Sequence, residues 1–285
     1  MSGDMSSMRK ARIGLVQMGM VQDRETNLSR ALSMVREAAD RGADMVCLPE
    51  LFNLPYFPRE QGSNAPAEPV PGSTTEALSR VARERRIILI GGSMHESSRG
   101  RKYNTSVIFD SDGTLLGKYR KVHLPQDTGF YEKDYFTGGR SYTVVQTGKA
   151  GIGVLICFDQ WFPEAARMNR LMGAEILFYP TAIGTVSELG QPEGDWQAAW
   201  EGVQRGHAIA NSMVVAAVNR VGSEGGTSFW GGSFVYDQFG TLIAKADERE
   251  RVLMADCNLD LGGEIEEGWG FMRNRRPETY GRISR

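Results

Sequence analysis

Apolar and polar residues follow two patterns along the chain: short continuous apolar runs, and longer segments with an apolar residue at every third or fourth position. The first pattern is typical of buried strands and the second of amphipathic helices. Residues 12–18 therefore predict a strand, and residues 27–41, which end at Gly42, predict a helix. Residues 43–48 predict the next strand, which makes a strand–helix–strand unit with parallel strands and a right-handed crossover.

The same order of elements returns in the second half of the chain. Residues 151–156 predict a buried strand, a helix follows to about residue 171, and residues 173–180 predict another strand. The segment GAEILFYP at 173–180 repeats the pattern of GADMVCLP at 42–49, in which glycine, alanine and an acid precede an apolar run that ends in proline. We interpret this similarity as an internal pseudo-duplication, which predicts a pseudo-two-fold relation between the halves.

The remaining apolar segments continue the alternation of strands and helices. Two long segments, 121–140 and 181–195, are expected to be irregular loops. After a disordered leader over residues 1–10, we expect one α/β domain over residues 11–285, with two sheets between layers of helices. The further expected elements are helices over 74–86 and 196–211, strands over 87–91, 213–219 and 252–258, and hairpins over 104–119 and 233–245.

Composition and charge exclude several classes of partner. The 285 residues carry a formal net charge of -2, which leaves no basic excess for nucleic acid or an anionic membrane. Apolar runs are shorter than a membrane span, and the opening segment MSGDMSSMRK lacks the apolar core of a signal peptide. We therefore expect a cytoplasmic protein with no nucleic-acid partner and no membrane partner.

The cysteines and histidines predict neither disulfides nor a metal site. Cys47, Cys157 and Cys257 are an odd number without a CxxC pair, which favours a reducing compartment. His95, His123 and His207 are far apart in sequence and form no HExxH motif. Each histidine is therefore expected to be a hydrogen-bonded structural residue rather than a metal ligand.

Cys157 occupies a position at which an α/β fold can present a nucleophile. It ends the predicted strand 151–156, and Pro163 fits the first turn of a following helix. The strand-to-helix elbow and the N–H groups of a helix N-terminus would favour the thiolate form. A cysteine here is either a nucleophile or a small buried core residue, and this segment alone does not distinguish the two.

Three other chemical groups stand just after a strand or in a long loop. Glu50 follows the strand end LP, Lys121 lies in YRKVHLP, and Glu132 lies in GFYEKDYF. Singly, these residues could equally be a helix cap and solvated surface charges. Together with Cys157 in CFDQWFPE, they resemble the Glu-Lys-Cys signature of the nitrilase, or carbon–nitrogen hydrolase, superfamily, and the resemblance covers nearly the whole chain.

The resemblance implies a four-layer α-β-β-α sandwich and a hydrolase without a metal or organic cofactor. It implies that the thiolate of Cys157 attacks a carbonyl carbon and that Glu50 carries the proton. Lys121 and the backbone N–H of Phe158 would stabilise the oxyanion. Glu132 would orient Lys121 or the substrate amine.

Within the superfamily, the chain is most similar to members that hydrolyse N-carbamoylputrescine, on segments such as GAEILFYPTAIG and WGFMRNRRPETY. The distal ammonium of that substrate calls for a carboxylate and aromatic walls. Glu188 is the candidate carboxylate, with Tyr56, Tyr131 and Trp161 as walls, although Glu188 could equally be a solvated loop residue.

Other readings remain open from the sequence. The substrate could be another ureide, such as an N-carbamoyl-β-amino acid, or a linear ω-amide, and a nitrile is a further possibility on the same residues. A distal carboxylate would call for Arg or Lys in the pocket. A non-catalytic binding scaffold of the same fold is opposed by the presence of all four chemical groups. The resemblance also implies a homo-oligomer built from dimers, in which the tail 269–280 packs on a neighbour.

Overall fold

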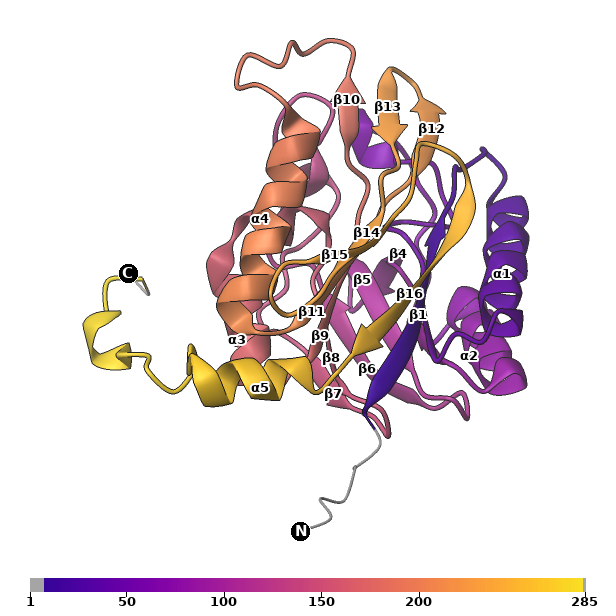
Figure 1. Cartoon of the computed structure of the whole chain (residues 1–285). Coiled ribbons are helices and arrows are strands. Elements are labelled where there is room, and N and C mark those ends of the chain that lie inside the picture. Colours follow the sequence, from indigo (N-terminus) through magenta and orange to yellow (C-terminus); the bar gives the residue numbers. More distant parts are fainter. Residues whose placement is uncertain (1–7, 284–285) are drawn as a thin grey trace.

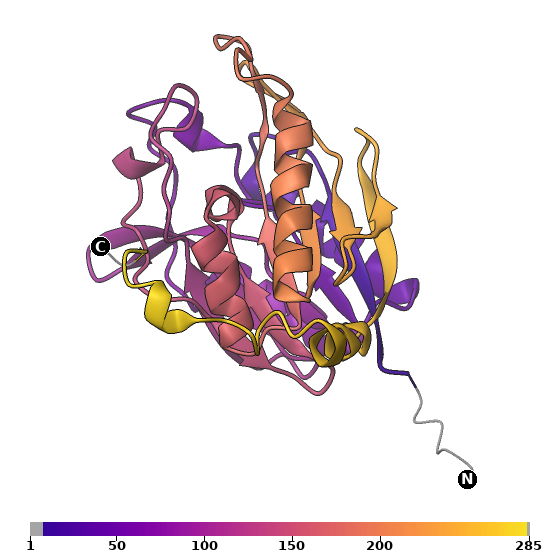
Figure 2. The same cartoon turned by 60° about the vertical axis from the view of Figure 1, so that its left-hand side comes forward.

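The computed structural model describes residues 8–283 and has four layers, in the order helices, sheet, sheet, helices (Figure 1). Helices α1 (Arg24–Asp40) and α2 (Ser73–Arg85) cover the outer face of one sheet. Helices α3 (Pro163–Leu171) and α4 (Trp196–Asn211) lie side by side on the outer face of the other (Figure 2). The predicted α-β-β-α sandwich is therefore confirmed.

The first sheet contains seven strands in the order β16–β1–β2–β3–β5–β4, with β6 paired to β5. Strands β1, β2 and β3 are mutually parallel, and the other pairs are antiparallel. Its strands are β1 (Lys10–Gln17), β2 (Met45–Cys47), β3 (Ile88–Ile90), β4 (Met94–Ser98), β5 (Arg101–Phe109), β6 (Leu115–Arg120) and β16 (Arg251–Asn258).

The second sheet contains six strands in the order β15–β14–β11–β9–β8–β7. Strands β8, β9 and β11 are parallel, and the outer pairs are antiparallel. Its strands are β7 (Val144–Gln146), β8 (Gly151–Val154), β9 (Ile176–Pro180), β11 (Val214–Val218), β14 (Phe234–Tyr236) and β15 (Leu242–Lys245).

Both sheets are built by the same sequence of connections. In the first half, β1, α1, β2, α2 and β3 are followed by the antiparallel hairpin β5–β6. In the second half, β8, α3, β9, α4 and β11 are followed by the antiparallel hairpin β14–β15. One antiparallel strand flanks each set, β16 beside β1 and β7 beside β8. The topology thus repeats as the duplicated sequence pattern predicted.

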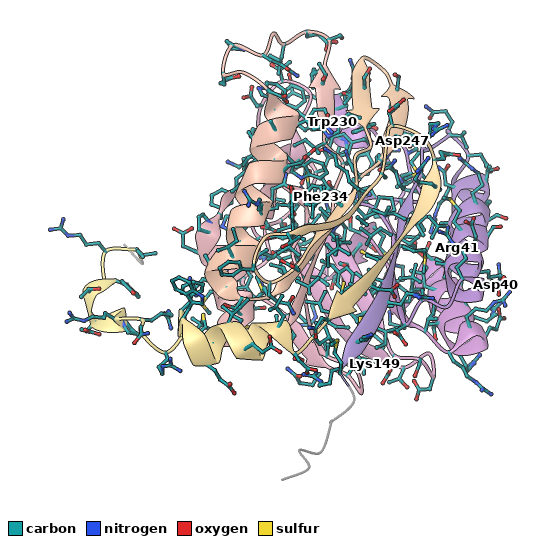
Figure 3. All side chains as sticks on the ribbon, viewed as in Figure 1. Asp40, Arg41, Lys149, Trp230, Phe234 and Asp247 are labelled. Carbon is teal, nitrogen blue, oxygen red and sulfur yellow. The ribbon has the colours of Figure 1, made fainter. Side chains whose placement is uncertain are left out.

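The continuous apolar runs reflect burial of both faces of the central strands. Met45 and Cys47 belong to the core between the two sheets, whereas Val46 belongs to the core under α1 and α2. Side chains alternate between the two faces of a strand, so a strand covered on both sides is apolar throughout. Side chains fill the space between all four layers (Figure 3). Gly14 lets α1 approach closely, because an added Cβ would lie 2.9 Å from the Cβ of Ala38.

Some elements differ from the sequence-based expectation. The segment 181–195, expected to be irregular, contains the short strand β10 (Gly184–Val186). This strand forms a three-stranded sheet with β13 (Thr227–Trp230) and β12 (Val221–Glu224). Strand β4 and helix α5 (Leu261–Gly268) were also not expected. These elements are short and lack a continuous apolar run; β4 pairs with the adjacent β5, whereas β10 pairs with β13, which is distant in sequence.

The N-terminal boundary lies slightly earlier than expected. Of the leader predicted over residues 1–10, residues 1–7 lie outside the described residues. Arg9 forms a 3.0 Å ion pair with Glu175, and Lys10 begins β1. Within residues 8–283, none of the helices has the length and apolar character needed to cross a membrane.

Candidate active site

Cys157 lies at a sharp turn between a strand and a helix, as predicted. Strand β8 ends at Val154, the short 3₁₀ helix η3 (Cys157–Trp161) follows, and α3 begins at Pro163. Cys157 has a backbone φ of +44°, in the left-handed region that non-glycine residues rarely adopt. Such strain persists only where the surrounding structure enforces it, and strand-to-helix turns of this kind display nucleophiles. The side chain is 7% exposed, and the thiol donates to the carbonyl of Ala182 at 3.9 Å.

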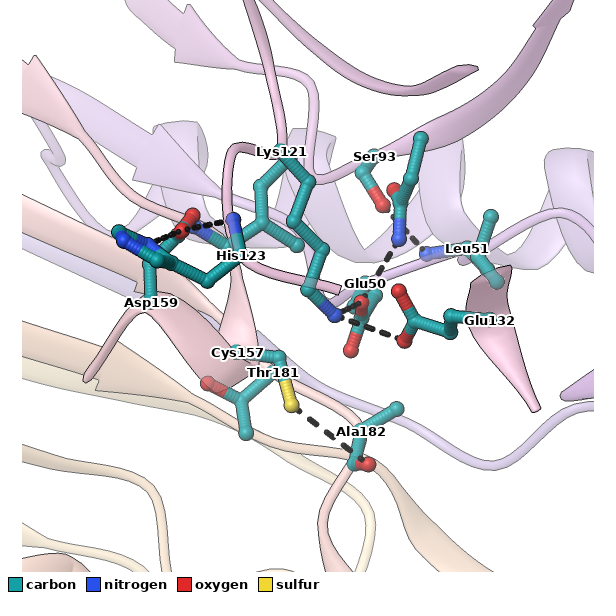
Figure 4. A network of polar contacts seen from close by, with 12 residues as sticks. Glu50, Leu51, Ser93, Lys121, His123, Glu132, Cys157, Asp159, Thr181 and Ala182 are labelled. Carbon is teal, nitrogen blue, oxygen red and sulfur yellow. Dashed lines mark hydrogen bonds and ion pairs between the residues drawn. The ribbon is translucent and has the colours of Figure 1, made fainter. Parts of the chain in front are cut away.

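Lys121 is completely buried between two carboxylates, one from the same loop and one from a distant segment. Its Nζ atom lies 2.8 Å from Oε1 of Glu50 and 2.7 Å from Oε1 of Glu132. Asn104 donates to Glu50 Oε1 at 2.8 Å, and the Tyr56 hydroxyl donates to Glu132 Oε1 at 2.7 Å. Figure 4 shows this cluster beside the sulfur of Cys157. The structure thus brings together the four groups that the sequence singled out.

Each carboxylate in this cluster keeps one oxygen free. Among the described residues, Oε2 of Glu50 and Oε2 of Glu132 are buried without a hydrogen-bond partner. Buried polar atoms are rarely left in this state, and exceptions often mark functional sites. These oxygens are therefore available to a substrate, a water molecule or a migrating proton.

Burial and charge set the protonation of the cluster. Burial opposes the ammonium of Lys121, but the carboxylates of Glu132 and Glu50 outweigh it and raise the pKa of Lys121. Burial also raises the pKa of Glu132 to about 7, against the opposing effect of Lys121. Burial and then the Glu50 carboxylate raise the pKa of the Cys157 thiol, although Lys121 lowers it. Burial and the Glu50 carboxylate thus oppose the thiolate that the elbow was expected to favour.

Arg220, which sequence reasoning missed, holds the backbone of Glu50. Its guanidinium is fully buried and donates to the carbonyl oxygens of Glu50 at 3.0 Å, Leu51 at 2.6 Å and Leu54 at 2.9 Å. Leu51, directly after Glu50, has a left-handed φ of +46°. The guanidinium also contacts Glu224 at 2.7 Å. The sequence offered one signal for Arg220: it is a polar residue just after the end of an apolar strand, as Glu50 is.

The predicted aromatic walls occupy different environments. Tyr56 is buried, and its hydroxyl is engaged by Glu132. Trp161 ends η3 and packs, partly buried, against the core between the sheets. Phe158 directly follows Cys157 in η3, where a backbone N–H can serve an oxyanion. Tyr131 is half-buried and precedes η2 (Glu132–Asp134).

Glu188 lies in a separate surface hollow, which we name the rim hollow, rather than in the buried cluster. Its side chain is 52% exposed and forms a 2.8 Å ion pair with Arg59. Glu188, Arg59 and Tyr131 line a hollow of about 320 Å³ together with Glu60. Arg59 brings a positive charge to the position where the sequence indicated only a carboxylate.

The histidines have structural contacts. His123 Nδ1 lies 2.7 Å from Oδ1 of Asp159, and His207 Nε2 lies 2.8 Å from the carbonyl of Gln160. The ring of His95 packs against the ring of Phe57, with 5.0 Å between centroids. In the part of the chain that the structure describes, no group of three or more His, Cys, Asp and Glu side chains is arranged to hold a metal ion.

Comparison with known proteins agrees with this geometry. A family model described as carbon–nitrogen hydrolase matches residues 12–267. The chain is 41% identical to an N-carbamoylputrescine amidase of Solanum lycopersicum, over 95% of this chain and 94% of that protein. It is 38% identical to an omega-amidase of Xenopus tropicalis (96% and 98% covered) and 36% identical to a citrullinase of Francisella tularensis (98% and 99% covered).

The structural comparison gives the same answer. The crystal structure of a carbon–nitrogen hydrolase from Helicobacter pylori G27 superposes with a TM-score of 0.90 at 34% identity, and the match covers 97% of this chain and 99% of that one. Family and fold agree over nearly the whole chain, and the relatives named above include amidases. The chain therefore belongs to the carbon–nitrogen hydrolase family and hydrolyses carbon–nitrogen bonds other than peptide bonds.

Proposed function

We propose that this enzyme is a thiol amidohydrolase that converts N-carbamoylputrescine and water into putrescine, carbon dioxide and ammonia. The observation that carries the proposal is the buried Glu50–Lys121–Glu132 cluster beside the Cys157 elbow. Hydrolysis of a ureide needs a nucleophile, a proton carrier and a fixed positive charge, and this cluster offers all three. The choice of substrate is supported by similarity to N-carbamoylputrescine amidases.

The first half of the reaction forms a covalent intermediate. Cys157 gives its proton to Glu50, whose Oε2 atom is free to receive it, and the sulfur attacks the carbamoyl carbon. The carbonyl electron pair moves onto oxygen, where the ammonium of Lys121 and the N–H of Phe158 stabilise the charge. Glu50 then passes the proton to the terminal amino group, the carbon–nitrogen bond breaks, and ammonia leaves a thiocarbamate on Cys157.

Water completes the cycle through the same base. Glu50 takes a proton from a water molecule, whose oxygen attacks the thiocarbamate carbon. The carbon–sulfur bond breaks, the sulfur takes up the proton, and the released carbamate decomposes into carbon dioxide and putrescine. The raised pKa of the Cys157 thiol is consistent with a mechanism that needs an adjacent base. Glu132 contributes by holding the ammonium of Lys121 in place.

The rim hollow is the proposed site for the far end of the substrate. Glu188 and Tyr131 line it, and Tyr131 directly precedes Glu132 of the buried cluster. A carboxylate and an aromatic ring are the groups that an alkylammonium prefers when it leaves water. We therefore keep Glu188 as the proposed partner of the distal ammonium, with its position already set by Arg59 and Ser187.

A second candidate substrate class is favoured by Arg59. Its guanidinium lines the same hollow, and a guanidinium suits a carboxylate. An ω-amide or a ureido acid with a distal carboxylate would pair with Arg59 rather than with Glu188. The deciding experiment is ammonia release by the purified protein from N-carbamoylputrescine, citrulline, an N-carbamoyl-β-amino acid and linear ω-amides. The proposal expects the highest kcat/KM for N-carbamoylputrescine, and a higher value for a carboxylate-bearing compound would replace it.

Substitution of Glu188 gives a sharper test of this substrate assignment. Glu188→Gln is expected to raise KM for N-carbamoylputrescine roughly tenfold, because a neutral amide no longer balances the ammonium. N-pentylurea, which replaces the ammonium by a methyl group, should show little change. The matched control is Glu193→Gln, at an exposed carboxylate of the same loop that does not line the hollow. An equal rise in KM for both substrates would mean that Glu188 stabilises the loop and does not bind the ammonium. No rise for either substrate would mean that Glu188 is a solvated surface residue.

We also propose a homo-oligomer built from dimers. The chain after α5 extends beyond the edge of the sheets (Figure 1), and Trp269 in it is 65% exposed. Beside this tail, α3 exposes Met168 and Leu171, and Arg167 contacts Met272 of the tail. An exposed apolar surface of this kind suits a two-fold contact. Light scattering at micromolar concentration is expected to show at least a dimer, and a monomer alone would contradict the proposal.

A further inference from the structure

Asp159 is a fully buried carboxylate two residues after the nucleophile, and both its oxygens accept hydrogen bonds. Oδ1 accepts from the backbone N–H of His123 at 2.9 Å and lies 2.7 Å from His123 Nδ1. Oδ2 accepts from the Tyr119 hydroxyl at 2.7 Å and from the backbone N–H of Ile156 at 2.9 Å. One side chain thus ties together two segments that are separated by more than thirty residues.

The partners of Asp159 flank the groups proposed for catalysis. Tyr119 and His123 lie two residues before and two residues after Lys121. Ile156 directly precedes Cys157. Figure 4 shows Asp159 and His123 beside Lys121, on the opposite side from Glu132. Asp159 therefore accepts hydrogen bonds from residues before and after Lys121 in the sequence, and from the residue that precedes Cys157.

The two segments come from different sheets. The segment with Lys121 follows β6 of the first sheet, and the segment with Cys157 follows β8 of the second. Lys121 and Cys157 are far apart in the sequence, so the covalent chain alone does not fix the ammonium relative to the sulfur. The ring of His123 also stacks on Phe162, with 3.7 Å between centroids and 9° between planes, which adds a second contact across the same boundary.

We propose that Asp159 is a positioning residue that sets the ammonium of Lys121 against the sulfur of Cys157. The inference rests on the proposed covalent mechanism and adds to it a residue that touches neither substrate nor reacting atoms. Displacement of a catalytic group by about 1 Å can cost on the order of a hundredfold in rate, so the link between the two segments controls turnover. Substrate binding at the rim hollow does not depend on this link, so KM should be largely spared.

The isosteric substitution Asp159→Asn tests the proposal. Asparagine has the same shape but only one acceptor atom, so its NH₂ group faces a backbone N–H donor in either orientation, that of His123 or that of Ile156. We expect kcat to fall at least about tenfold while KM changes by less than about twofold, at a temperature where circular dichroism shows a folded protein. Tyr119→Phe should lower kcat less, and the double variant should be less than additive, since both changes act on one hydrogen bond.

The matched control is Glu68→Gln, at a second buried carboxylate whose hydrogen-bond partners lie outside the site. Glu68 is 8% exposed, accepts from Arg24 at 2.5 Å and from the backbone N–H of Thr74 at 3.0 Å, and contacts none of the four proposed catalytic groups. Its loss should lower the melting temperature but leave kcat unchanged. If Asp159→Asn does the same, Asp159 is only structural and the proposal is overturned.

A second readout does not need the substrate. Alkylation of Cys157 by iodoacetamide, followed by mass spectrometry, reports the thiolate that Lys121 stabilises. Asp159→Asn should slow this alkylation at least about fivefold, whereas Glu68→Gln should not. If the wild-type protein hydrolyses no compound of the panel, the proposed function fails, yet slower alkylation would still support positioning. Unchanged or faster alkylation would overturn it.

Discussion

Cys157→Ala is expected to abolish hydrolysis, with kcat reduced at least about a thousandfold, and to leave the fold intact. The variant removes the atom that forms the covalent intermediate, and neither Glu50 nor Lys121 can replace it. The structural loss is small, because alanine keeps the Cβ atom and the thiol makes only a long hydrogen bond, to the Ala182 carbonyl at 3.9 Å. Ammonia release and circular dichroism measure the two effects on the same sample.

The control for this prediction is another buried cysteine. Cys257 lies in β16 and is 1% exposed, so Cys257→Ala removes an equally buried sulfur from outside the site. It should retain normal kcat. Retention of more than a few per cent of turnover by Cys157→Ala would exclude covalent catalysis at this residue. In the wild-type protein, rapid quenching should reveal an N-(4-aminobutyl)carbamoyl adduct on the peptide that contains Cys157.

Lys121→Met is expected to reduce both activity and stability. Without the ammonium, Glu50 and Glu132 are two buried carboxylates with no cation between them. Removing one partner of a buried ion pair costs about 3–5 kcal/mol of unfolding free energy, because the remaining charge is left uncompensated. Loss of oxyanion stabilisation should lower kcat at least about a hundredfold. Urea unfolding and steady-state kinetics measure these two losses.

The stability deficit of Lys121→Met should depend on pH. Burial already raises the pKa of Glu132 to about 7, and Lys121 is the group that opposes this rise. Without Lys121 the pKa of Glu132 rises further. Near neutral pH, Glu132 of the folded variant therefore keeps a proton that it loses on unfolding. Stability of the variant then falls as the pH rises, and the deficit should be smaller at about pH 5.5 than at about pH 8.

The control for Lys121→Met is Lys118→Met, at a lysine in β6, the strand that directly precedes Lys121. Lys118 pairs with the buried Glu96 at 2.7 Å, but its side chain is 36% exposed, and Arg120 also pairs with Glu96 at 2.7 Å. Glu96 therefore keeps a cation, and the variant should remain close to wild type in both measurements. An equal deficit in the two lysine variants, or a Lys121→Met deficit independent of pH, would contradict the burial argument.

The long elements followed from local patterns in the sequence. The helix expected over 196–211 coincides with α4, because its side chains follow one regular period and Asp195 caps its start by accepting from Ala198. The central parallel strands were equally visible as continuous apolar runs, since both their faces are covered. Strand β10 was missed because its partner β13 lies far away in the chain, and β4, with the sequence MHESS, was missed because it lacks an apolar run.

The sequence by itself determined the chemical groups of the candidate site. Glu50, Lys121, Glu132 and Cys157 stand in segments with distinctive neighbours, and the elbow at Cys157 is a local feature of strand, turn and proline. Their order and neighbouring residues were sufficient to identify the family, because a short motif consists of consecutive residues. The convergence of these groups was predicted from the resemblance, whereas its geometry required the fold.

Only the tertiary structure decided how these groups are held and charged. The bonds of Arg220 to Glu50 and of Asp159 to His123 join residues 170 and 36 positions apart, so no local pattern contains them. The pairing of Glu188 with Arg59 likewise spans 129 positions. The raised pKa of the Cys157 thiol combines burial with the charges of Glu50, Lys121 and Glu132, none of which is close to Cys157 in sequence. Electrostatic energies depend on distance and on exclusion of water, and both exist only once the sheets have packed together.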